Sequence, residues 1–278
     1  MATLPSPPPA LPSPVIDSHV HLDLIGEFGG VEVGQGLALA DAVAVPQVIQ
    51  VGIDLPSSRR AVDLAADYEA VLGAAVGVHP NEAPDRIKSG DFAADLLGLA
   101  ELALAPNVVA IGETGLDHFR TEPAGRHDQE AAFREHIRLA RATNRTLIIH
   151  DRDAHSQVLD VLATEDLPDR VVFHCFSGDV AMAREVAAAG WFLSFSGVIT
   201  FKNAPELRAA AQAVPLTSIL VETDAPFLTP APNRGRPNAS YLLPYTVAEV
   251  ARCCETELEV MCRQLAANTR RAFGLAIS

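Results

Sequence analysis

Two histidines, His19 and His21, follow the apolar pair Val15 and Ile16 near the start of the chain. In an extended strand, side chains at positions i and i+2 point to the same side, roughly 6–7 Å apart. Both imidazoles can therefore converge on one point at the end of a strand. Two ligands of a metal ion would be presented in this way, although the spacing also fits two polar residues at an exposed strand end.

More side chains that can bind metal follow apolar runs in the rest of the chain. They are His79, Glu113, His150, His174 and Asp224. Burying such groups costs free energy unless they are paired or bound to a metal. Because they recur at corresponding positions, they predict a metal centre rather than a series of separate core histidines.

The number of candidate ligands indicates two ions. One ion could be held by His19, His21 and Asp224, and the other by His150 and His174. Glu113 has two carboxylate oxygens and could bridge both ions. Two divalent ions about 3.5–4 Å apart would activate a water and polarise a phosphoryl or carbonyl oxygen. Asp224 could also accept the proton of that water. These ligands suit Mg, Mn or Zn, and the sequence does not choose among them.

The elements that must position these groups alternate between strand-like and helix-like stretches. The clearest predicted helix covers residues 126–143, with Phe133 and Ile137 on its apolar face and with His127 and His136 expected at the surface. Continuous apolar strands are typical of parallel sheets. Eight units in about 250 residues predict a (β/α)8 barrel of the TIM type, whose strand ends meet at one mouth. An open doubly wound sheet is the alternative, but no Gly-rich phosphate loop follows the first strand.

The bulk composition predicts one globular domain. The chain has 278 residues, 49% of them hydrophobic, which is enough for a single large core. We expect a disordered Pro-rich segment at residues 1–14 and the barrel domain at residues 15–278. No apolar run reaches about 18 residues, so no membrane span is expected. The four cysteines form no CxxC pair, which favours a reduced, cytoplasmic protein.

The net charge of −14 limits the ways in which this chain could bind nucleic acid. Proteins that coat duplex DNA are normally basic. Any contact is therefore expected to be local, at a strand end or a short single strand. Arg234, in a Pro-rich loop, either clamps a substrate phosphate or is a solvated charge. His79 either contacts substrate or holds a loop through Pro80, and Asp117 either orients a ligand imidazole or caps a turn.

Several motifs resemble the TatD family of metal-dependent hydrolases, a branch of the amidohydrolase superfamily. The motifs that carry the resemblance run from Val15 to Phe273: Ile16-Asp17-Ser18-His19-Val20-His21-Leu22-Asp23, Gly77-Val78-His79-Pro80, Gly112-Glu113-Thr114-Gly115-Leu116-Asp117, Ile149-His150, His174-Cys175-Phe176-Ser177-Gly178, Phe201-Lys202-Asn203-Ala204, Glu222-Thr223-Asp224-Ala225-Pro226, Arg234-Gly235, and Asn268 with Arg271 and Phe273. The resemblance implies a TIM-type barrel, a two-metal site and Mg²⁺-dependent DNase activity. Carried over by position, it implies the ligands His19, His21, Glu113, His150, His174 and Asp224.

Two departures from the family pattern lie beside the candidate ligands and could alter substrate choice. His118 stands where the family usually has Tyr, and Ala239-Ser240 follows Asn238 where Glu-Pro is usual. Sister amidohydrolases bridge their metals with a carboxylated lysine at the fourth strand. Neither Lys88 nor Lys202 ends such a run, which argues against that type of centre.

The first functional hypothesis is a deoxyribonuclease that works from the 3′ end of single-stranded DNA, with Glu113 and Asp224 as catalytic residues and His79 and Arg234 as substrate contacts. The alternative is a carbonyl hydrolase, such as an amidase, a lactonase or an aminoacyl-tRNA deacylase. A non-enzymatic barrel is a third possibility, against which the complete ligand set argues. The sequence makes no prediction of the oligomeric state.

Overall fold

Eight parallel strands form the centre of the computed structural model, which describes residues 4–28 and 30–276. The strands are β1 (Ile16–Val20), β2 (Gln47–Val51), β3 (Val71–Val76), β4 (Val108–Asp117), β5 (Thr146–Arg152), β6 (Val171–Phe173), β7 (Phe192–Phe195) and β8 (Ile219–Val221). They pair in sequence order, and a parallel bridge between Val20 and Ala225 joins the chain after β8 to β1. The predicted TIM-type barrel is confirmed.

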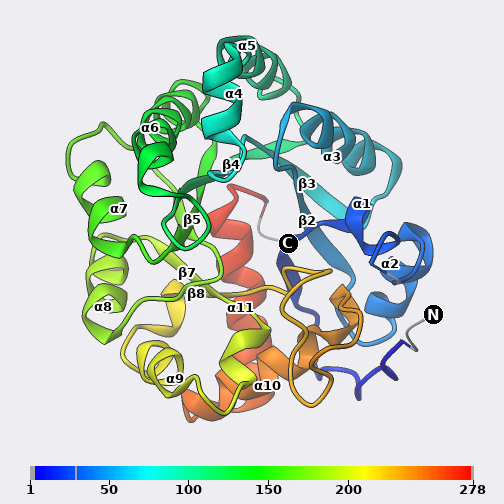
Figure 1. Cartoon of the computed structure of the whole chain (residues 1–278). Coiled ribbons are helices and arrows are strands. Elements are labelled where there is room, and N and C mark those ends of the chain that lie inside the picture. The colour runs from blue at the N-terminus through cyan, green and yellow to red at the C-terminus, as the bar shows by residue number, and fades with distance from the viewer. Residues whose placement is uncertain (1–3, 29, 277–278) are drawn as a thin grey trace.

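The α-helices surround these strands (Figure 1). They are α1 (Leu22–Ile25), α2 (Val33–Asp41), α3 (Leu55–Asp67), α4 (Ala83–Ser89), α5 (Phe92–Leu102), α6 (Arg126–Thr143), α7 (His155–Leu162), α8 (Val180–Ala188), α9 (Pro205–Gln212), α10 (Leu243–Cys253) and α11 (Leu258–Ala272). Short 3-10 helices lie at Pro123–Gly125, Gly197–Thr200, Leu216–Ser218 and Ser240–Leu242. None of the described helices has both the length and the apolar character needed to cross a membrane.

Helix α6 has the bounds predicted from its apolar periodicity, but the expectation that His136 lies on its surface is wrong. His136 is fully buried. The backbone N–H of Val78 donates to its Nε2 at 3.0 Å, and its Nδ1 lies 2.7 Å from the carbonyl oxygen of Ala132. The imidazole therefore joins α6 to the chain that follows β3.

Side chains along each strand alternate between two cores, because successive residues of a strand point to opposite faces. In β5, Leu147 and Ile149 belong to the core shared with the helices, whereas Ile148 belongs to a separate cluster inside the barrel. His150 follows Ile148 by two residues, so its side chain continues the row that faces the interior. The same spacing relates His174 to Val172 of that interior cluster.

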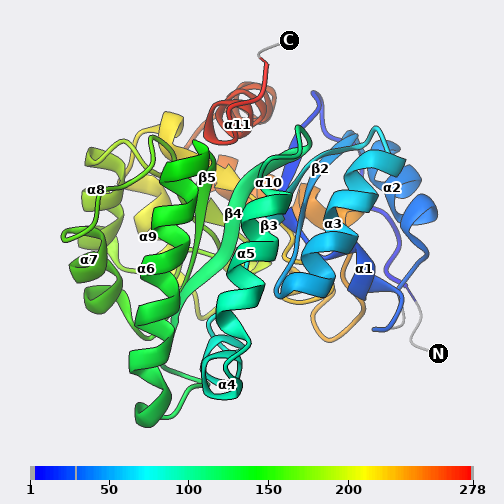
Figure 2. The same cartoon turned by 90° about the horizontal axis from the view of Figure 1, so that it is seen from above.

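Helix α11 covers one end of the barrel (Figure 2). The amide of Asn268 donates to the carbonyl oxygens of Leu216 and Ile219, each at 2.7 Å, and the hydroxyl of Thr146 donates to Ala272 at 2.7 Å. Ile219 and Thr146 are the first residues of their strands. Since α11 occupies the end where strands begin, the candidate ligands emerge at the opposite end.

Residues 4–14 have no regular secondary structure, yet they pack against the barrel. Leu11 is buried, and its N–H donates to the carbonyl oxygen of Val43 at 3.2 Å. The hydroxyl of Tyr241 donates to the carbonyl oxygen of Pro5 at 3.0 Å. This packing differs from the disordered segment expected at residues 1–14, because apolar residues among the prolines find partners. Residues 1–3 lie outside the described part of the chain.

Candidate metal centre

Glu113 lies at the centre of the site, and its two oxygens face two different pairs of imidazoles. Oε2 is 3.4 Å from Nε2 of His19 and 3.8 Å from Nε2 of His21. Oε1 is 2.8 Å from Nε2 of His174 and 2.9 Å from Nδ1 of His150. The position of Glu113 after an apolar run predicted that it would end its strand. In the structure β4 continues to Asp117. The carboxylate nevertheless lies between the two pairs, where a bridging ligand was expected.

Asp224 completes the group around the first pair of histidines. Its Oδ1 is 3.4 Å from Nε2 of His21 and 3.8 Å from Nε2 of His19. The backbone N–H of Asp224 donates to the carbonyl oxygen of His19 at 3.0 Å, which ties the two segments together. The structure thus brings together all six side chains that the sequence singled out as ligands.

The hydrogen bond behind each ring determines which nitrogen can bind a metal. Nδ1 of His21 lies 2.9 Å from the carbonyl oxygen of Val51, which can only accept a hydrogen bond. In the neutral ring the proton is therefore on Nδ1, and Nε2 presents a lone pair to Glu113 and Asp224. Nδ1 of His174 lies 3.2 Å from a carboxylate oxygen of Glu222, with the same consequence for its Nε2.

His150 uses the opposite nitrogen. Its Nε2 lies 3.3 Å from Oδ2 of Asp117, so Nδ1 is left to face the site. Asp117 is itself held in place, because Oδ1 accepts the backbone N–H groups of Phe119 and Arg120 at 3.0 and 2.8 Å. Both roles that the sequence left open for Asp117, orienting an imidazole and capping a turn, are present together.

Ring nitrogens converge in both pairs of histidines. Nε2 of His19 is 3.3 Å from Nε2 of His21, and Nδ1 of His150 is 3.3 Å from Nε2 of His174. Two unprotonated nitrogens at this separation repel each other in a buried site, so each pair needs either a proton or a cation between its nitrogens. Imidazole nitrogens and carboxylate oxygens are also the ligands that divalent transition metals prefer. The residues therefore fit a metal ion.

The raised pKa values of His21 and His174 also indicate that positive charge is favourable in this site. Burial disfavours a charged His21, but its bond to the charged Asp224 outweighs burial and raises the pKa of His21 to about 9. Burial also opposes a charged His174, yet Glu113 and Glu222 raise its pKa well above the usual range. A bound divalent ion would supply this positive charge in place of the protons.

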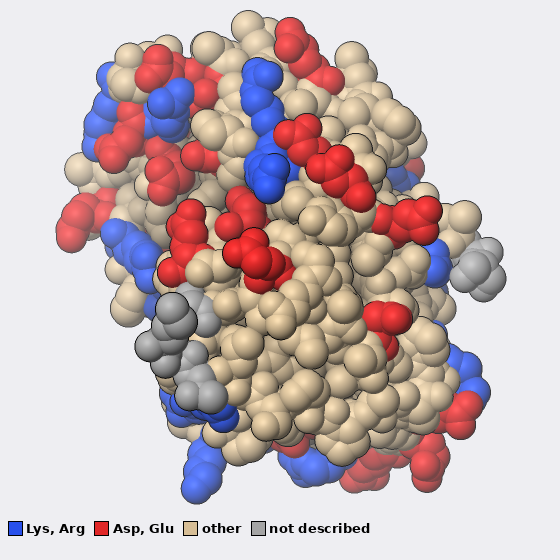
Figure 3. Space-filling model, turned by 90° about the vertical axis from the view of Figure 1, so that its right-hand side faces the viewer, with Lys and Arg blue, Asp and Glu red and all other residues tan. Residues whose placement is uncertain are grey.

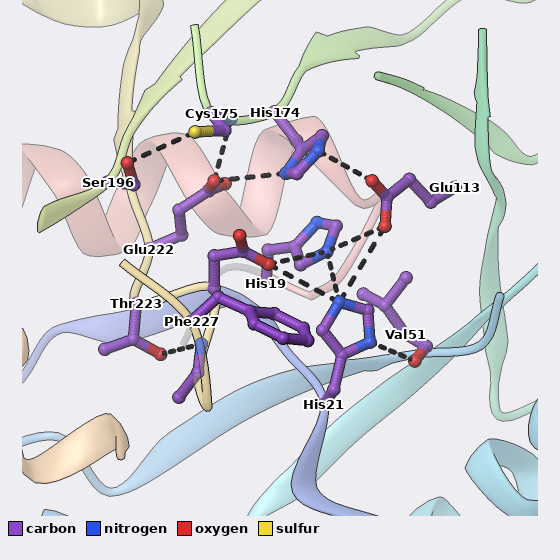
Figure 4. Close-up of polar contacts among 12 residues, drawn as sticks. His19, His21, Val51, Glu113, His174, Cys175, Ser196, Glu222, Thr223 and Phe227 are labelled. Atoms are coloured by element: carbon purple, nitrogen blue, oxygen red, sulfur yellow. Dashed lines mark hydrogen bonds and ion pairs between the residues drawn. The ribbon is translucent and has the colours of Figure 1, made fainter. Parts of the chain in front are cut away.

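Glu222 is the residue of the site that sequence reasoning missed (Figure 4). It is fully buried, and its Oε1 also accepts the backbone N–H of Cys175 at 2.7 Å. Its Oε2 and Nδ1 of His19 have no hydrogen-bond partner in the described structure. Potential ligand atoms of His19, His174 and Glu222 lie within 4.8 Å of one another. The signal was available, because Glu222 precedes Asp224 by two residues and therefore shares its side of an extended chain.

His79 also faces Glu113, but with a proton instead of a lone pair. Its Nε2 is 3.4 Å from Oε1 of Glu113, and its Nδ1 accepts the backbone N–H of Asn81 at 3.0 Å. Burial lowers the pKa of His79 even though Glu113 opposes that shift. The neutral ring must then carry its proton on Nε2, which makes it a hydrogen-bond donor to the site.

Arg234 lies apart from this group of side chains. It is exposed, and its guanidinium carbon lies 4.0 Å from the centre of the Phe201 ring. Phe201 follows β7 and Arg234 follows β8, so both belong to loops at the end of the barrel that carries the candidate ligands. The structure thus shows an aromatic partner for Arg234, which the sequence did not predict.

Comparisons with known proteins place the chain in a family. The sequence profile of the family described as TatD related DNase matches residues 16–274. The uncharacterized metal-dependent hydrolase TatD of Mycobacterium tuberculosis is 43% identical over 268 residues, which cover 94% of this chain and 98% of that protein. The uncharacterized metal-dependent hydrolase YcfH of Escherichia coli K12 is 38% identical over 262 residues, which cover 94% of each chain.

Solved structures agree with this placement. The TatD homologue YJJV of Escherichia coli K12 superposes with a TM-score of 0.85 at 27% identity, covering 94% of this chain and 98% of that one. A phosphotriesterase homology protein from Escherichia coli shares the fold alone, with a TM-score of 0.69 at 17% identity. Together with the match over residues 16–274, these relatives show that the chain belongs to the TatD family of metal-dependent hydrolases.

Proposed function

We propose that this protein is a two-metal phosphodiesterase that removes nucleotides from the 3′ end of single-stranded DNA. The observation that supports it most is the placement of Glu113, whose two oxygens face two separate pairs of imidazole nitrogens. In a two-metal site, one carboxylate commonly bridges both ions. The DNA substrate is supported by the description of the family as TatD related DNase.

Each ion would have its own ligands. One ion would bind His19, His21 and Asp224, the other would bind His150 and His174, and Glu113 would bind both. Bound Mg²⁺, Mn²⁺ or Zn²⁺ ions supply an activated water and polarise the phosphoryl oxygen. Asp117 and Glu222 keep the rings of His150 and His174 in the orientation that this binding requires.

Two side chains of the site can handle protons. The side chain of Asp224 is 13% exposed, compared with 4% for Glu113, so Asp224 lies on the open side of the site and is placed to accept the proton of the attacking water. The Nε2–H of His79 is placed to donate a hydrogen bond to a phosphoryl oxygen. Arg234, held against Phe201, would contact a phosphate further along the strand.

The charge of the molecule favours attack at a strand end over binding along a duplex. The net charge is −14. On the face shown in Figure 3, acidic and basic side chains are interspersed and a broad area carries neither. A protein with so large a net negative charge gains little affinity from phosphate neutralisation. Local contacts at the metal centre would then supply the affinity.

The substitution Glu113→Gln tests the proposal. We expect the variant to lose roughly a thousandfold or more in kcat on 5′-labelled single-stranded DNA with Mg²⁺ or Mn²⁺, because one bridging charge is removed. Metal content should be measured in parallel. Glu101→Gln, on the exposed surface of α5, is the matched control and should keep full activity. Full activity of Glu113→Gln would contradict the proposal, and hydrolysis of carboxylic esters or amides without DNA cleavage would favour the carbonyl alternative.

A further inference from the structure

Exposed phenylalanines gather at one end of this barrel. Six large apolar side chains are exposed among the described residues: Phe28, Leu97, Leu104, Phe119, Phe227 and Val260. The three phenylalanines lie in segments that follow β1 and α1, β4 and β8, at the end that carries the metal centre. The three aliphatic residues lie in or beside α5, on the outside of the barrel, and α11, at its opposite end. Exposed aromatic rings grouped beside a site commonly mark a binding surface.

The rings of Phe28 and Phe227 are in contact, and the Phe227 ring also lies beside a candidate metal ligand. The ring centroids of Phe28 and Phe227 are 5.4 Å apart, at an interplanar angle of 73°. The Phe227 ring is also 6.1 Å from the ring of His21, and Figure 4 shows it beside that imidazole. Phe28 is 53% exposed and Phe227 is 40% exposed. The pair therefore presents aromatic surface to solvent next to the place where hydrolysis would occur.

The backbone of Phe227 is fixed by hydrogen bonds on both sides. Its N–H donates to the carbonyl oxygen of Asp224 at 2.9 Å, and the side-chain amide of Asn238 donates to its own carbonyl oxygen. Only two residues, Ala225 and Pro226, separate Phe227 from the candidate ligand Asp224. A ring held in this way loses little conformational freedom when a flat molecule stacks on it.

The chemistry of the surroundings identifies what would stack there. The chain has a net charge of −14, so phosphate neutralisation contributes little to the affinity for a nucleic acid. Proteins that bind single strands obtain the remaining affinity from aromatic side chains, on which successive bases stack irrespective of sequence. A ring pair beside a phosphodiesterase centre fits that requirement, because every unpaired base offers a flat face.

We propose that Phe28 and Phe227 form a stacking site for the unpaired nucleobase next to the scissile phosphate. This inference rests on the proposed phosphodiesterase function and adds to it the recognition of the terminal nucleotide. The pair recognises a base through its flat face, so it selects single-stranded ends over paired ends without selecting a sequence.

The test compares two 5′-labelled single-stranded oligonucleotides that differ only in the terminal 3′ unit, which carries adenine in one and is abasic in the other. We expect the wild-type protein to show a KM about tenfold to a hundredfold higher for the abasic end, with kcat less affected. Phe227→Ala and Phe28→Ala should raise KM by a similar factor for the adenine end and leave the abasic end unchanged.

Three controls keep the result interpretable. Leu97→Ala removes an exposed apolar side chain from α5, far from the candidate ligands, and should change the KM of neither substrate. Phe227→Leu retains apolar bulk without a ring and should behave like Phe227→Ala. Because Phe227 touches His21, the metal content and thermal unfolding of each variant are measured, and Phe28→Ala provides a test at a residue without that contact.

Different failures point to different proposals. Equal KM values of the wild type for both ends, or a loss in the phenylalanine variants that is the same for both ends, would overturn the stacking site and leave the phosphodiesterase intact. Failure of the wild type to cleave either end would overturn the phosphodiesterase. In that case, binding of dAMP and of deoxyribose 5-phosphate decides: a preference for dAMP that Phe227→Ala abolishes supports stacking, and equal binding overturns it.

Discussion

Glu222 is a single residue outside the six proposed ligands, yet it positions side chains within that set. Its Oε1 accepts the Nδ1 proton of His174, while its Oε2 and Nδ1 of His19 are both buried without a hydrogen-bond partner in the described structure. The rings of His19 and His174 are stacked, with centroids 4.1 Å apart. Glu222 thus orients His174 directly and acts on His19 through the stacked rings, so its loss should weaken both metal positions.

We expect Glu222→Gln to lower the affinity for Mn²⁺ by roughly tenfold to a hundredfold, because an amide is a weaker acceptor and its NH₂ group cannot accept the proton of an imidazole. Isothermal titration of the metal-free protein gives the dissociation constants. Glu101→Gln serves again as the matched surface control. Unchanged Mn²⁺ affinity in Glu222→Gln would show that the carboxylate does not orient the ligands.

His79 shows why residue type alone does not define a ligand. The sequence leaves His79 without a place in either set of ligands and allows it to contact substrate or to hold a loop through Pro80. The structure supplies a physical reason, since the backbone N–H of Asn81 occupies Nδ1 and leaves the proton on Nε2. A ring with that proton can donate a hydrogen bond but has no lone pair to offer a metal at that atom.

In helix α6, the apolar periodicity of the sequence predicted the bounds of the helix correctly, but residue polarity led to a wrong prediction for His136. Phe133, His136, Ile137 and Ala140 follow the i, i+3, i+4, i+7 spacing of one helix face, and all four are buried. Periodicity therefore placed His136 on the buried face, but its polarity suggested the surface. Hydrogen bonds to Val78 and Ala132 compensate for the burial of the ring.

The buried His136 should make the stability of the protein depend on pH. Burial lowers its pKa to about 4, although the hydrogen bond to Ala132 opposes the shift. Because the unfolded chain, with a pKa of about 6.5, binds this proton more readily, stability is complete above pH 6.5 and falls as the pH drops toward 4. We expect a loss of about 2 kcal/mol between pH 7 and pH 5 from this group.

Urea unfolding at pH 7 and pH 5 measures this dependence. His136→Gln should be less stable than the wild type at pH 7, but its free energy of unfolding should fall less between the two pH values, because Gln does not titrate. The other histidines and the carboxylates titrate equally in both proteins, so the difference isolates His136. An identical decrease in both proteins would contradict the assignment.

The two ends of the barrel have different roles: one is closed by packing contacts, and the other carries the candidate metal centre. Helix α11 closes the end where the strands begin, through hydrogen bonds of Asn268 and Ala272. The candidate ligands, the exposed phenylalanines and Arg234 all lie on segments at the other end. This is the end at which TIM barrels place their active sites, because the loops there can vary without disturbing the core.

The net charge leads to a prediction about salt. A protein that contacts 6–10 phosphates loses about 10³–10⁵ in affinity between roughly 50 and 200 mM salt. With a net charge of −14, we expect KM for single-stranded DNA to change by less than about tenfold over that range or to fall as salt increases. Steady-state cleavage of linear strands at several salt concentrations measures this, and a steep rise in KM would contradict local binding.

Features that depend on local order along the chain could be predicted from the amino-acid sequence. Apolar runs followed by His, Glu or Asp predicted the strands of the barrel and six residues that meet at one site, because strand direction in a parallel barrel carries every strand end to one mouth. The motifs also predicted the family, which the comparisons confirmed.

Features that depend on residues far apart in the sequence became visible only in the folded protein. Glu222 lies 48 positions from His174 and Val51 lies 30 positions from His21, yet these partners determine which nitrogen carries a proton. The contact between Phe28 and Phe227 has no local signature either. The position of a proton on an imidazole and the exposure of a ring depend on the partners that folding brings together. Spacing along the chain does not predict those partners.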